Sequence, residues 1–292
     1  MTKGSQTIGM IGVGLMGHGI ALNIAKSGRK LLFLDHSGNQ DTADLVALGG
    51  EPVATCAEIA RRSEAVVICV TGTPQVEDVL FREDGLLKGM SQGMIIIDCS
   101  TALPASTIEI AQTVAAAGGH FLDAPMTRTP KEAAEGRLNL IVGGDRALFD
   151  ACLPLFESFA ENITYGGGSG AGHTLKLIHN YVSLGFSAVL SEAAKTANLS
   201  NVSPEKLVEV LETGAGAGPI LQRFKPFLKD HNTEAFTFAI ANAAKDMGYF
   251  TAMADDLDAP VKVAASVQHL YQDLVEGDHG HRYLPEVIDL IG

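Results

Sequence analysis

Short apolar runs alternate with amphipathic stretches through the first half of the chain. Most of the runs are continuously apolar, which is typical of strands covered on both faces. The stretches between them, such as 15–27 and 104–117, have helical periodicity. Because strands and helices alternate, the pattern predicts βαβ units and a doubly wound parallel sheet. The expected strands are 7–11, 30–34, 65–70, 94–97, 120–122 and 138–142.

The pattern changes after a glycine cluster at 166–172, and from there helical periodicity dominates. A long helix is expected from about 171 to 198, and shorter helices follow it without any strand-like run. The change predicts two domains, an α/β domain over residues 1–165 and an all-α domain over residues 166–292. The other expected helices of this second domain are 204–213, 236–256 and 260–276.

Composition and charge exclude several classes of partner. The chain has 292 residues, 21 Lys and Arg against 34 Asp and Glu, and a formal net charge of −13. A protein of this charge repels nucleic acid and anionic lipid, so neither is an expected partner. The sequence also contains no signal-peptide pattern and no apolar run near the roughly 20 residues that cross a bilayer. We therefore expect a cytoplasmic protein without a membrane span.

The cysteines and histidines do not indicate a metal site. The four cysteines lie far apart and form no CxxC pair, which argues against both a zinc site and a disulfide framework. His279 and His281 are two residues apart, but no acid or cysteine at ligand spacing accompanies them. No metal is therefore expected.

The first motif with a chemical meaning is the segment Gly-Val-Gly-Leu-Met-Gly at 12–17, which follows an expected strand and begins a helix. Gly12 permits a tight turn, Gly14 lets a pyrophosphate approach the backbone, and Gly17 lets helix and strand pack closely. The helix N-terminus adds free N–H groups and a partial positive charge. We expect this segment to bind a dinucleotide through Gly12, Gly14, Leu15, Met16 and Gly17.

An acidic residue ends the second expected strand. Asp35 lies eighteen residues after Gly17, where a carboxylate accepts hydrogen bonds from the adenosine ribose and repels a 2′-phosphate. The next residues, His36 and Ser37, include no Arg that could bind such a phosphate. The cofactor is therefore expected to be NAD rather than NADP.

The second motif begins the long helix. Lys176 and Asn180 are four residues apart, so they share one face of that helix. A lysine there could protonate the alkoxide that forms when a carbonyl is reduced, and Asn180 could bind the substrate or hold the ammonium. The alternative is a lysine that extends from the helix edge into solvent.

Four ordered segments resemble the signatures of the β-hydroxyacid dehydrogenases, the 3-hydroxyisobutyrate dehydrogenase family. The resemblance implies an N-terminal Rossmann domain with a doubly wound sheet, an all-α C-terminal domain and a long interdomain helix between them. It also implies assembly into homodimers or homotetramers. The segments are 12–17 with Asn23 and Gly28, 123–126 with 136–138 and 143–144, 170–180, and 245–247.

The resemblance also assigns roles to individual residues. It makes Lys176 the catalytic residue and Asn180 its substrate-contacting neighbour, and it places Lys245 near the nicotinamide. The segment at 98–101 is similar to an Asp-x-Ser-Thr turn, whose hydroxyls on Ser100 and Thr101 face substrate and cofactor.

The chain departs from the family pattern in the substrate loop. Thr127, Arg128 and Thr129 replace the usual Ser-Gly-Gly, and they are the expected substrate-binding residues of this loop. The segment resembles the Gly-Arg-Thr variant of the sulfolactaldehyde reductases, in which the Arg recognises a sulfonate. The guanidinium has a planar fork that fits a carboxylate or a sulfonate. The alternative is a solvated arginine, or one that pairs with Glu132 or Glu135.

These features together predict an NAD-dependent oxidoreductase that interconverts a small β-hydroxy acid or hydroxysulfonate and its semialdehyde. Reduction of 3-sulfolactaldehyde is the most specific version, because of Arg128. Tartronate semialdehyde (2-hydroxy-3-oxopropionate) and 3-hydroxyisobutyrate are the alternative substrates. An imine reductase usually has another residue at the position of Lys176, and a non-catalytic dinucleotide-binding module would have lost it.

Overall fold

The computed structural model describes residues 6–292. The chain divides between Lys176 and Leu177 into two compact units. The helix α8 (Ala171–Leu199) contains the point of division, so its first turn belongs to the first unit. The expected domain boundary at residue 165 lies inside a strand, β9 (Ala160–Gly167).

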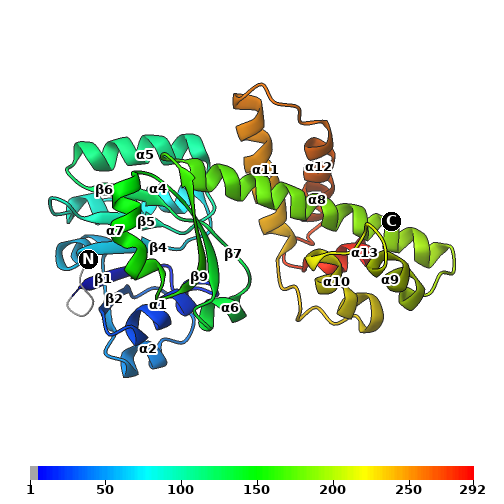
Figure 1. The fold of residues 1–292 in the computed structure, drawn as a ribbon, viewed down its shortest axis with the longest axis horizontal. Coiled ribbons are helices and arrows are strands. Elements are labelled where there is room, and N and C mark those ends of the chain that lie inside the picture. Colours follow the sequence, from blue (N-terminus) through cyan, green and yellow to red (C-terminus); the bar gives the residue numbers. More distant parts are fainter. Residues whose placement is uncertain (1–5) are drawn as a thin grey trace. The chain divides into compact units, whose positions relative to one another are not determined.

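The first unit is built on one mixed sheet (Figure 1). Its order is β3-β2-β1-β4-β5-β6-β8-β7, and β9 pairs with β8. All pairs from β3 to β6 are parallel, whereas β8 runs antiparallel to β6 and β7 and parallel to β9. The remaining strands are β1 (Thr7–Ile11), β2 (Lys30–Leu34), β3 (Glu51–Val53), β4 (Ala65–Ile68), β5 (Ile95–Asp98), β6 (His120–Asp123), β7 (Met126–Thr127) and β8 (Leu138–Gly143).

Successive residues of the central strands point into two different cores. In β4, Ala65 and Val67 belong to one apolar cluster, while Val66 and Ile68 belong to the other. Because both faces of the strand are covered, its sequence is apolar throughout. The first core includes side chains of α1 (Gly17–Lys26), α2 (Ala43–Ala47), α6 (Pro130–Ala134) and α7 (Arg146–Phe156). The second includes α3 (Cys56–Arg62), α4 (Thr73–Phe81), the 3₁₀ turn η1 (Leu86–Lys88) and α5 (Pro104–Ala116).

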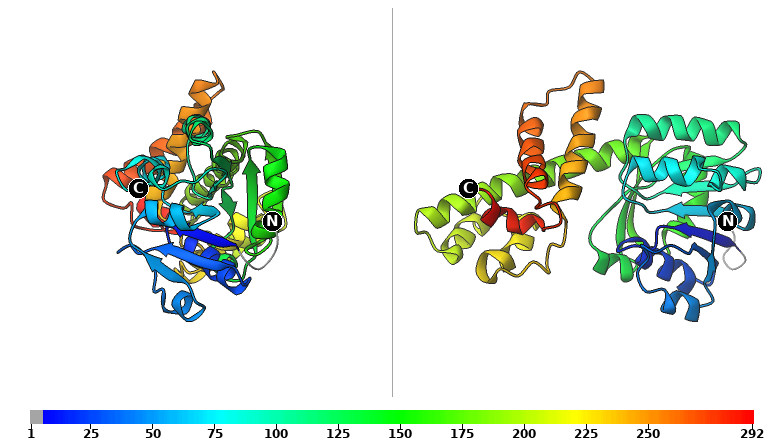
Figure 2. Two further views of the ribbon diagram at one scale, coloured as in Figure 1. Left: turned by 90° about the vertical axis from the view of Figure 1, so that its left-hand side faces the viewer. Right: turned by 180° about the vertical axis from the view of Figure 1, so that it is seen from behind.

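The second unit is helical and has its own apolar core. In it α11 and α12 lie side by side as a hairpin, seen from the front in Figure 1 and from behind in the right-hand view of Figure 2. Its elements after α8 are α9 (Pro204–Glu212), α10 (Pro219–Asp230), α11 (Ile240–Asp256), α12 (Lys262–Glu276), the 3₁₀ turn η2 (Leu284–Glu286) and α13 (Val287–Leu290).

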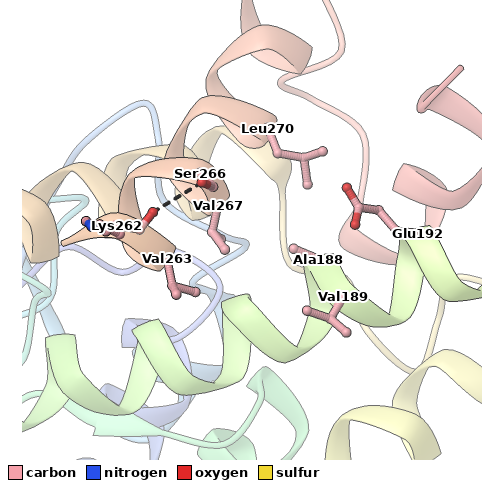
Figure 3. A pocket seen from close by; sticks show the side chains of 8 residues that line it. All are labelled: Ala188, Val189, Glu192, Lys262, Val263, Ser266, Val267 and Leu270. Carbon is pink, nitrogen blue, oxygen red and sulfur yellow. Dashed lines mark hydrogen bonds between the residues drawn. The ribbon is translucent and has the colours of Figure 1, made fainter. Parts of the chain in front are cut away.

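A hollow of about 290 Å³ lies between α8 and α12 of this unit (Figure 3). Side chains of both helices line it, including Val189 from α8 and Val263 and Leu270 from α12. None of the residues expected at the active site lines this hollow. It is therefore not the candidate site.

The predicted fold class is confirmed: a parallel-dominated α/β unit precedes a helical one. The expected strands at 7–11 and 30–34 match β1 and β2 in both bounds. The strands β3, β7 and β9 were not among the expected strands, and α10 and α13 were not among the expected helices of the second unit. Among the described residues, no helix has the length and apolar character that a membrane span requires.

Candidate active site

The glycine loop connects β1 to α1 at the carboxyl edge of the parallel strands. Gly12 has a φ of 90°, and a Cβ there would lie 2.1 Å from the carbonyl oxygen of Cys69, so only glycine fits. A Cβ at Gly17 would lie 1.8 Å from the Gly12 carbonyl oxygen. Gly14 differs from both, because a Cβ added there would have no atom within 4 Å apart from those of Gly14 and its two chain neighbours. The loop thus packs closely against the end of β4 at Gly12 and leaves free space next to Gly14.

This opening fits a dinucleotide pyrophosphate. Helix α1 begins at Gly17 without a side-chain cap on its first N–H groups, and such groups bind phosphate oxygens. The chain order reverses between β1 and β4, and ligands of open α/β sheets bind at such a switch point. Leu15 is 64% exposed beside Met16 in the same loop. Asp35 follows β2 at the same edge and is exposed.

The ends of β4 and β5 are linked by Ser100. Its hydroxyl oxygen accepts the Val70 N–H at 3.0 Å, and its own N–H donates to Asp98 Oδ1 at 2.9 Å. Ser100 is only 3% exposed, so its side chain connects the two strand ends. Thr101 follows in the loop and is half-buried.

A buried histidine and a buried carboxylate lie next to this turn. His173 Nε2 donates to the Ser100 carbonyl at 3.1 Å and lies 3.9 Å from Asp98 Oδ2. His173 Nδ1 is 2.7 Å from the hydroxyl of Thr107. Burial raises the pKa of Asp98, while the nearby His173 and the hydrogen bonds from Ser100 oppose that shift. His173 therefore connects the first turn of α8 to the end of β5.

A second buried carboxylate fixes the start of α8. Asp123 ends β6, and its two oxygens accept the backbone N–H groups of Gly170 at 2.9 Å and His173 at 3.0 Å. These are donors that the first turn of a helix otherwise leaves without partners. A Cβ at Gly172 would lie 2.7 Å from Asp123 Oδ2, so glycine lets the helix approach the carboxylate. The helix that contains Lys176 is thus fixed to the sheet edge.

Lys176 and Asn180 lie one helical turn apart on α8. Lys176 is half-buried and ends the first unit. Within the second unit, Asn180 Nδ2 donates to Asp246 Oδ2 at 2.6 Å, and its Oδ1 accepts from His179 at 3.0 Å. Asp246 Oδ1 accepts from Lys245 Nζ at 2.5 Å. A buried carboxylate on α11 therefore joins two of the predicted site residues.

The substrate loop follows β7 and is supported from two sides. Thr127 Oγ1 accepts from Asn139 on β8 at 3.0 Å, and Asn139 Oδ1 accepts from Asn162 on β9 at 2.8 Å. Because the Thr127 oxygen is the acceptor at the end of this series of hydrogen bonds, its own O–H does not donate to Asn139. On the other side, Asn23 of α1 donates to the carbonyl of Ala133, at the end of the short helix that follows the loop.

Arg128 occupies an unusual backbone conformation in this loop. Its φ is 85°, in the region that favours glycine and costs other residues roughly 1–2 kcal/mol. Its guanidinium Nη1 binds the Glu161 carboxylate and the Arg137 carbonyl. Neither expected alternative partner contacts it. Glu132 instead accepts the Thr129 N–H at 3.0 Å, and Glu135 binds the side chain of Arg137 at 2.9 Å.

Four buried residues, each near predicted site residues of its own unit, received no functional role from the sequence. Asp98, Asp123 and Asp246 are carboxylates with at most 3% exposure, and His173 is fully buried. An acidic residue that ends a buried strand, as Asp98 and Asp123 do, was the available signal. Among residues 6–292, no group of three His, Cys, Asp or Glu side chains is arranged to hold a metal ion.

Comparisons with known proteins agree with this architecture. Residues 7–167 match the family model described as the NAD binding domain of 6-phosphogluconate dehydrogenase, and residues 170–291 match that of NADP-dependent 3-hydroxyisobutyrate dehydrogenase. A 2-hydroxy-3-oxopropionate reductase of Escherichia coli is 38% identical over 216 residues, 74% of this chain and 73% of its own length. A 3-sulfolactaldehyde reductase of the same organism is 28% identical over 97% of this chain and 95% of its own.

A solved structure supports the same relationship. A 3-hydroxyisobutyrate dehydrogenase from Salmonella typhimurium superposes with a TM-score of 0.85 at 27% identity. The match covers 98% of this chain and 100% of that one.

Proposed function

Because the chain belongs to the β-hydroxyacid dehydrogenase family and has its NAD(P)-binding domains, we propose that it reduces a short semialdehyde that carries an anionic group. The favoured substrate is 3-sulfolactaldehyde, in which the sulfonate is attached two carbons from the aldehyde carbon. The product is the corresponding primary alcohol, and the reaction is reversible.

The observation that carries this proposal is the conformation of Arg128. Arg128 has a φ of 85°, a backbone conformation that glycine would adopt without strain. Strained residues cluster at functional sites, where the surrounding structure holds them. The side chain provides a positive charge and a planar fork in the substrate loop, and both suit a sulfonate or a carboxylate.

Lys176 is the proposed proton donor. When bound, the reduced nicotinamide supplies the hydride that reaches the aldehyde carbon. The Lys176 ammonium then gives a proton to the carbonyl oxygen as it becomes an alkoxide, and in the oxidation direction the neutral amine accepts that proton. Acid–base help of this kind is worth about 10²–10⁴-fold in rate. Asp123 supports the step, because it holds the first turn of α8.

Asn180 is the proposed contact to a substrate hydroxyl. An amide nitrogen has two hydrogens, and Asp246 accepts only one of those on Asn180 Nδ2. The second can donate to the substrate. Lys245 is held by the same carboxylate, and we assign it to the nicotinamide side of the site.

NAD is the proposed cofactor. Asp35 is exposed at the carboxyl end of β2, where its charge would repel the 2′-phosphate of NADP and its oxygens would accept from the ribose hydroxyls.

A second candidate substrate is 2-hydroxy-3-oxopropionate. The observation in its favour is the 38% identity to a reductase of that name. Its carboxylate is attached to the carbon next to the aldehyde, one carbon nearer than the sulfonate of 3-sulfolactaldehyde, and the planar fork of Arg128 also fits a carboxylate.

The experiment that tests the proposal is a panel of alcohols offered to the purified protein with NAD. Absorbance at the NADH maximum reports turnover of dihydroxypropanesulfonate, glycerate and 3-hydroxyisobutyrate. We expect the highest kcat/KM with the sulfonate and the next with glycerate. Turnover of 3-hydroxyisobutyrate alone would contradict the proposal.

A further inference from the structure

An irregular step in strand pairing places Glu161 beside the substrate loop. On β8 and β9, Leu138 pairs with Ala160 and the next residue, Asn139, pairs with Asn162. Glu161 is therefore an extra residue on β9, and this arrangement is a β-bulge. Bulges redirect a side chain and are common next to active sites.

The bulge lets two consecutive residues of β9 support two consecutive residues of the substrate loop. Asn162 reaches Thr127 through Asn139, as described above. Glu161 reaches Arg128 directly through an ion pair. In a regular strand two neighbouring side chains point to opposite faces, so one of these two contacts would be lost.

The contacts of Arg128 determine which part of its guanidinium is used. Glu161 and the Arg137 carbonyl both bind Nη1, which has two hydrogens. Neither contact uses the edge formed by Nε and Nη2. This edge is one of the two-donor faces that bind a carboxylate or a sulfonate in a bidentate manner. Glu161 thus holds the side chain without occupying that edge.

We propose that Glu161 is a positioning residue for substrate recognition: it fixes Nη1 of Arg128 so that the Nε–Nη2 edge is preorganised for the substrate anion. This inference rests on the proposed function, because it requires that Arg128 binds that anion. The hydrogen bond from Arg128 lowers the pKa of Glu161, so the carboxylate stays charged at neutral pH. Without Glu161, the long side chain of Arg128 would sample other rotamers, and each binding event would have to order it.

The test compares Glu161→Ala and Glu161→Gln with Glu135→Gln. Glu135 is a matched control, because it binds Arg137 in the same region but does not contact Arg128. The kinetics are measured with 3-sulfolactaldehyde or 2-hydroxy-3-oxopropionate, and with glyceraldehyde as an uncharged analogue. We expect Glu161→Ala to raise KM for the anionic aldehydes about 10-fold, with kcat within about twofold. Glu161→Gln retains an acceptor oxygen and should recover part of this loss, while glyceraldehyde kinetics and the control variant should be unchanged.

The same comparison in an Arg128→Ala background separates the proposed role of Glu161 from the proposed role of Arg128. If Glu161 acts through Arg128, Glu161→Ala has no further effect there. A lower KM in Glu161→Ala would overturn the inference, because Glu161 would then compete with the substrate. An equal increase in KM on Glu161→Ala in the parent and in the Arg128→Ala background would also overturn the inference. If Arg128→Ala itself leaves the preference for anionic aldehydes intact, the proposed function fails, and this inference fails with it.

Discussion

The carboxylate of Asp123, at the end of β6, accepts the backbone N–H of His173 in the first turn of α8. Its other oxygen accepts the N–H of Gly170. One buried side chain of the sheet therefore sets where the helix with Lys176 begins.

Replacing Asp123 should consequently destabilise the protein strongly. Asp123→Ala leaves two buried N–H groups without an acceptor, at about 1–3 kcal/mol each, so we expect a loss of about 2–6 kcal/mol. Urea unfolding followed by circular dichroism measures it. Asp145→Ala is the control, because Asp145 caps α7 through the Leu148 N–H at an exposed site. That change should cost about 1 kcal/mol, and an equal cost at both positions would contradict the account.

Asp98 predicts a pH dependence of stability. Its pKa is raised in the folded protein, chiefly by burial and also by the charge of Asp123, against the opposing effects of His173 and Ser100. A raised folded-state pKa gives stability that is present below the unfolded-state pKa and lost as the pH rises through the folded-state pKa.

Asp98→Asn removes this titration while it keeps an oxygen for the Ser100 N–H. The free energy of unfolding of the variant minus that of the parent should therefore increase from about pH 4 towards pH 7, by at most about 1.4 kcal/mol per pH unit. Denaturation series at several pH values measure the difference. A difference that stays constant or decreases over this range would mean that Asp98 is not perturbed as described.

Lys176→Ala should lower kcat by at least about 10²-fold and leave NAD binding intact. The reason is that the side chain supplies the proton, while the glycine loop at 12–17 binds the cofactor. Steady-state kinetics and titration of NADH fluorescence measure the two effects. Lys195→Ala, about 28 Å further along the same helix, is the control. Near-normal turnover of Lys176→Ala would remove this residue from the catalytic step.

Asp35→Ala should reduce the preference for NAD over NADP about tenfold, because a charge that repels the 2′-phosphate is lost. The ratio of kcat/KM for the two cofactors measures this preference. Asp41→Asn, in the loop after β2, should leave it unchanged. If Asp35→Ala also leaves the preference for NAD over NADP unchanged, another residue determines that preference.

The sequence predicted the elements whose apolar pattern is simple. The central strands are covered on both faces, and their apolar runs revealed them. The strand β9 was missed because its buried and exposed residues do not alternate regularly: the bulge at Glu161 interrupts the period, and the strand ends in glycines. β7 is only two residues long, too short for any period to show.

The sequence also located the glycine loop, Asp35 and the helix with Lys176, because each follows a local motif. It could not identify the partners of these residues, which come from distant parts of the chain. Glu161 is 33 residues from Arg128, and Asp246 is 66 residues from Asn180. Glu132 and Glu135 were the partners considered for Arg128 if it did not bind a substrate anion, because they are near in sequence, but the pairing of β8 with β9 brings Glu161 to it.

The central claim is that this protein selects aldehydes by their anionic group, and one measurement tests it most directly. Glyceraldehyde differs from 3-sulfolactaldehyde only in a hydroxyl in place of the sulfonate. Comparing kcat/KM for the two, in the parent protein and in Arg128→Ala, therefore isolates recognition of the anion. We expect a preference of at least about 10²-fold for the sulfonate in the parent, and its near-complete loss in the variant. Equal kcat/KM values for the two aldehydes in the parent protein would contradict it.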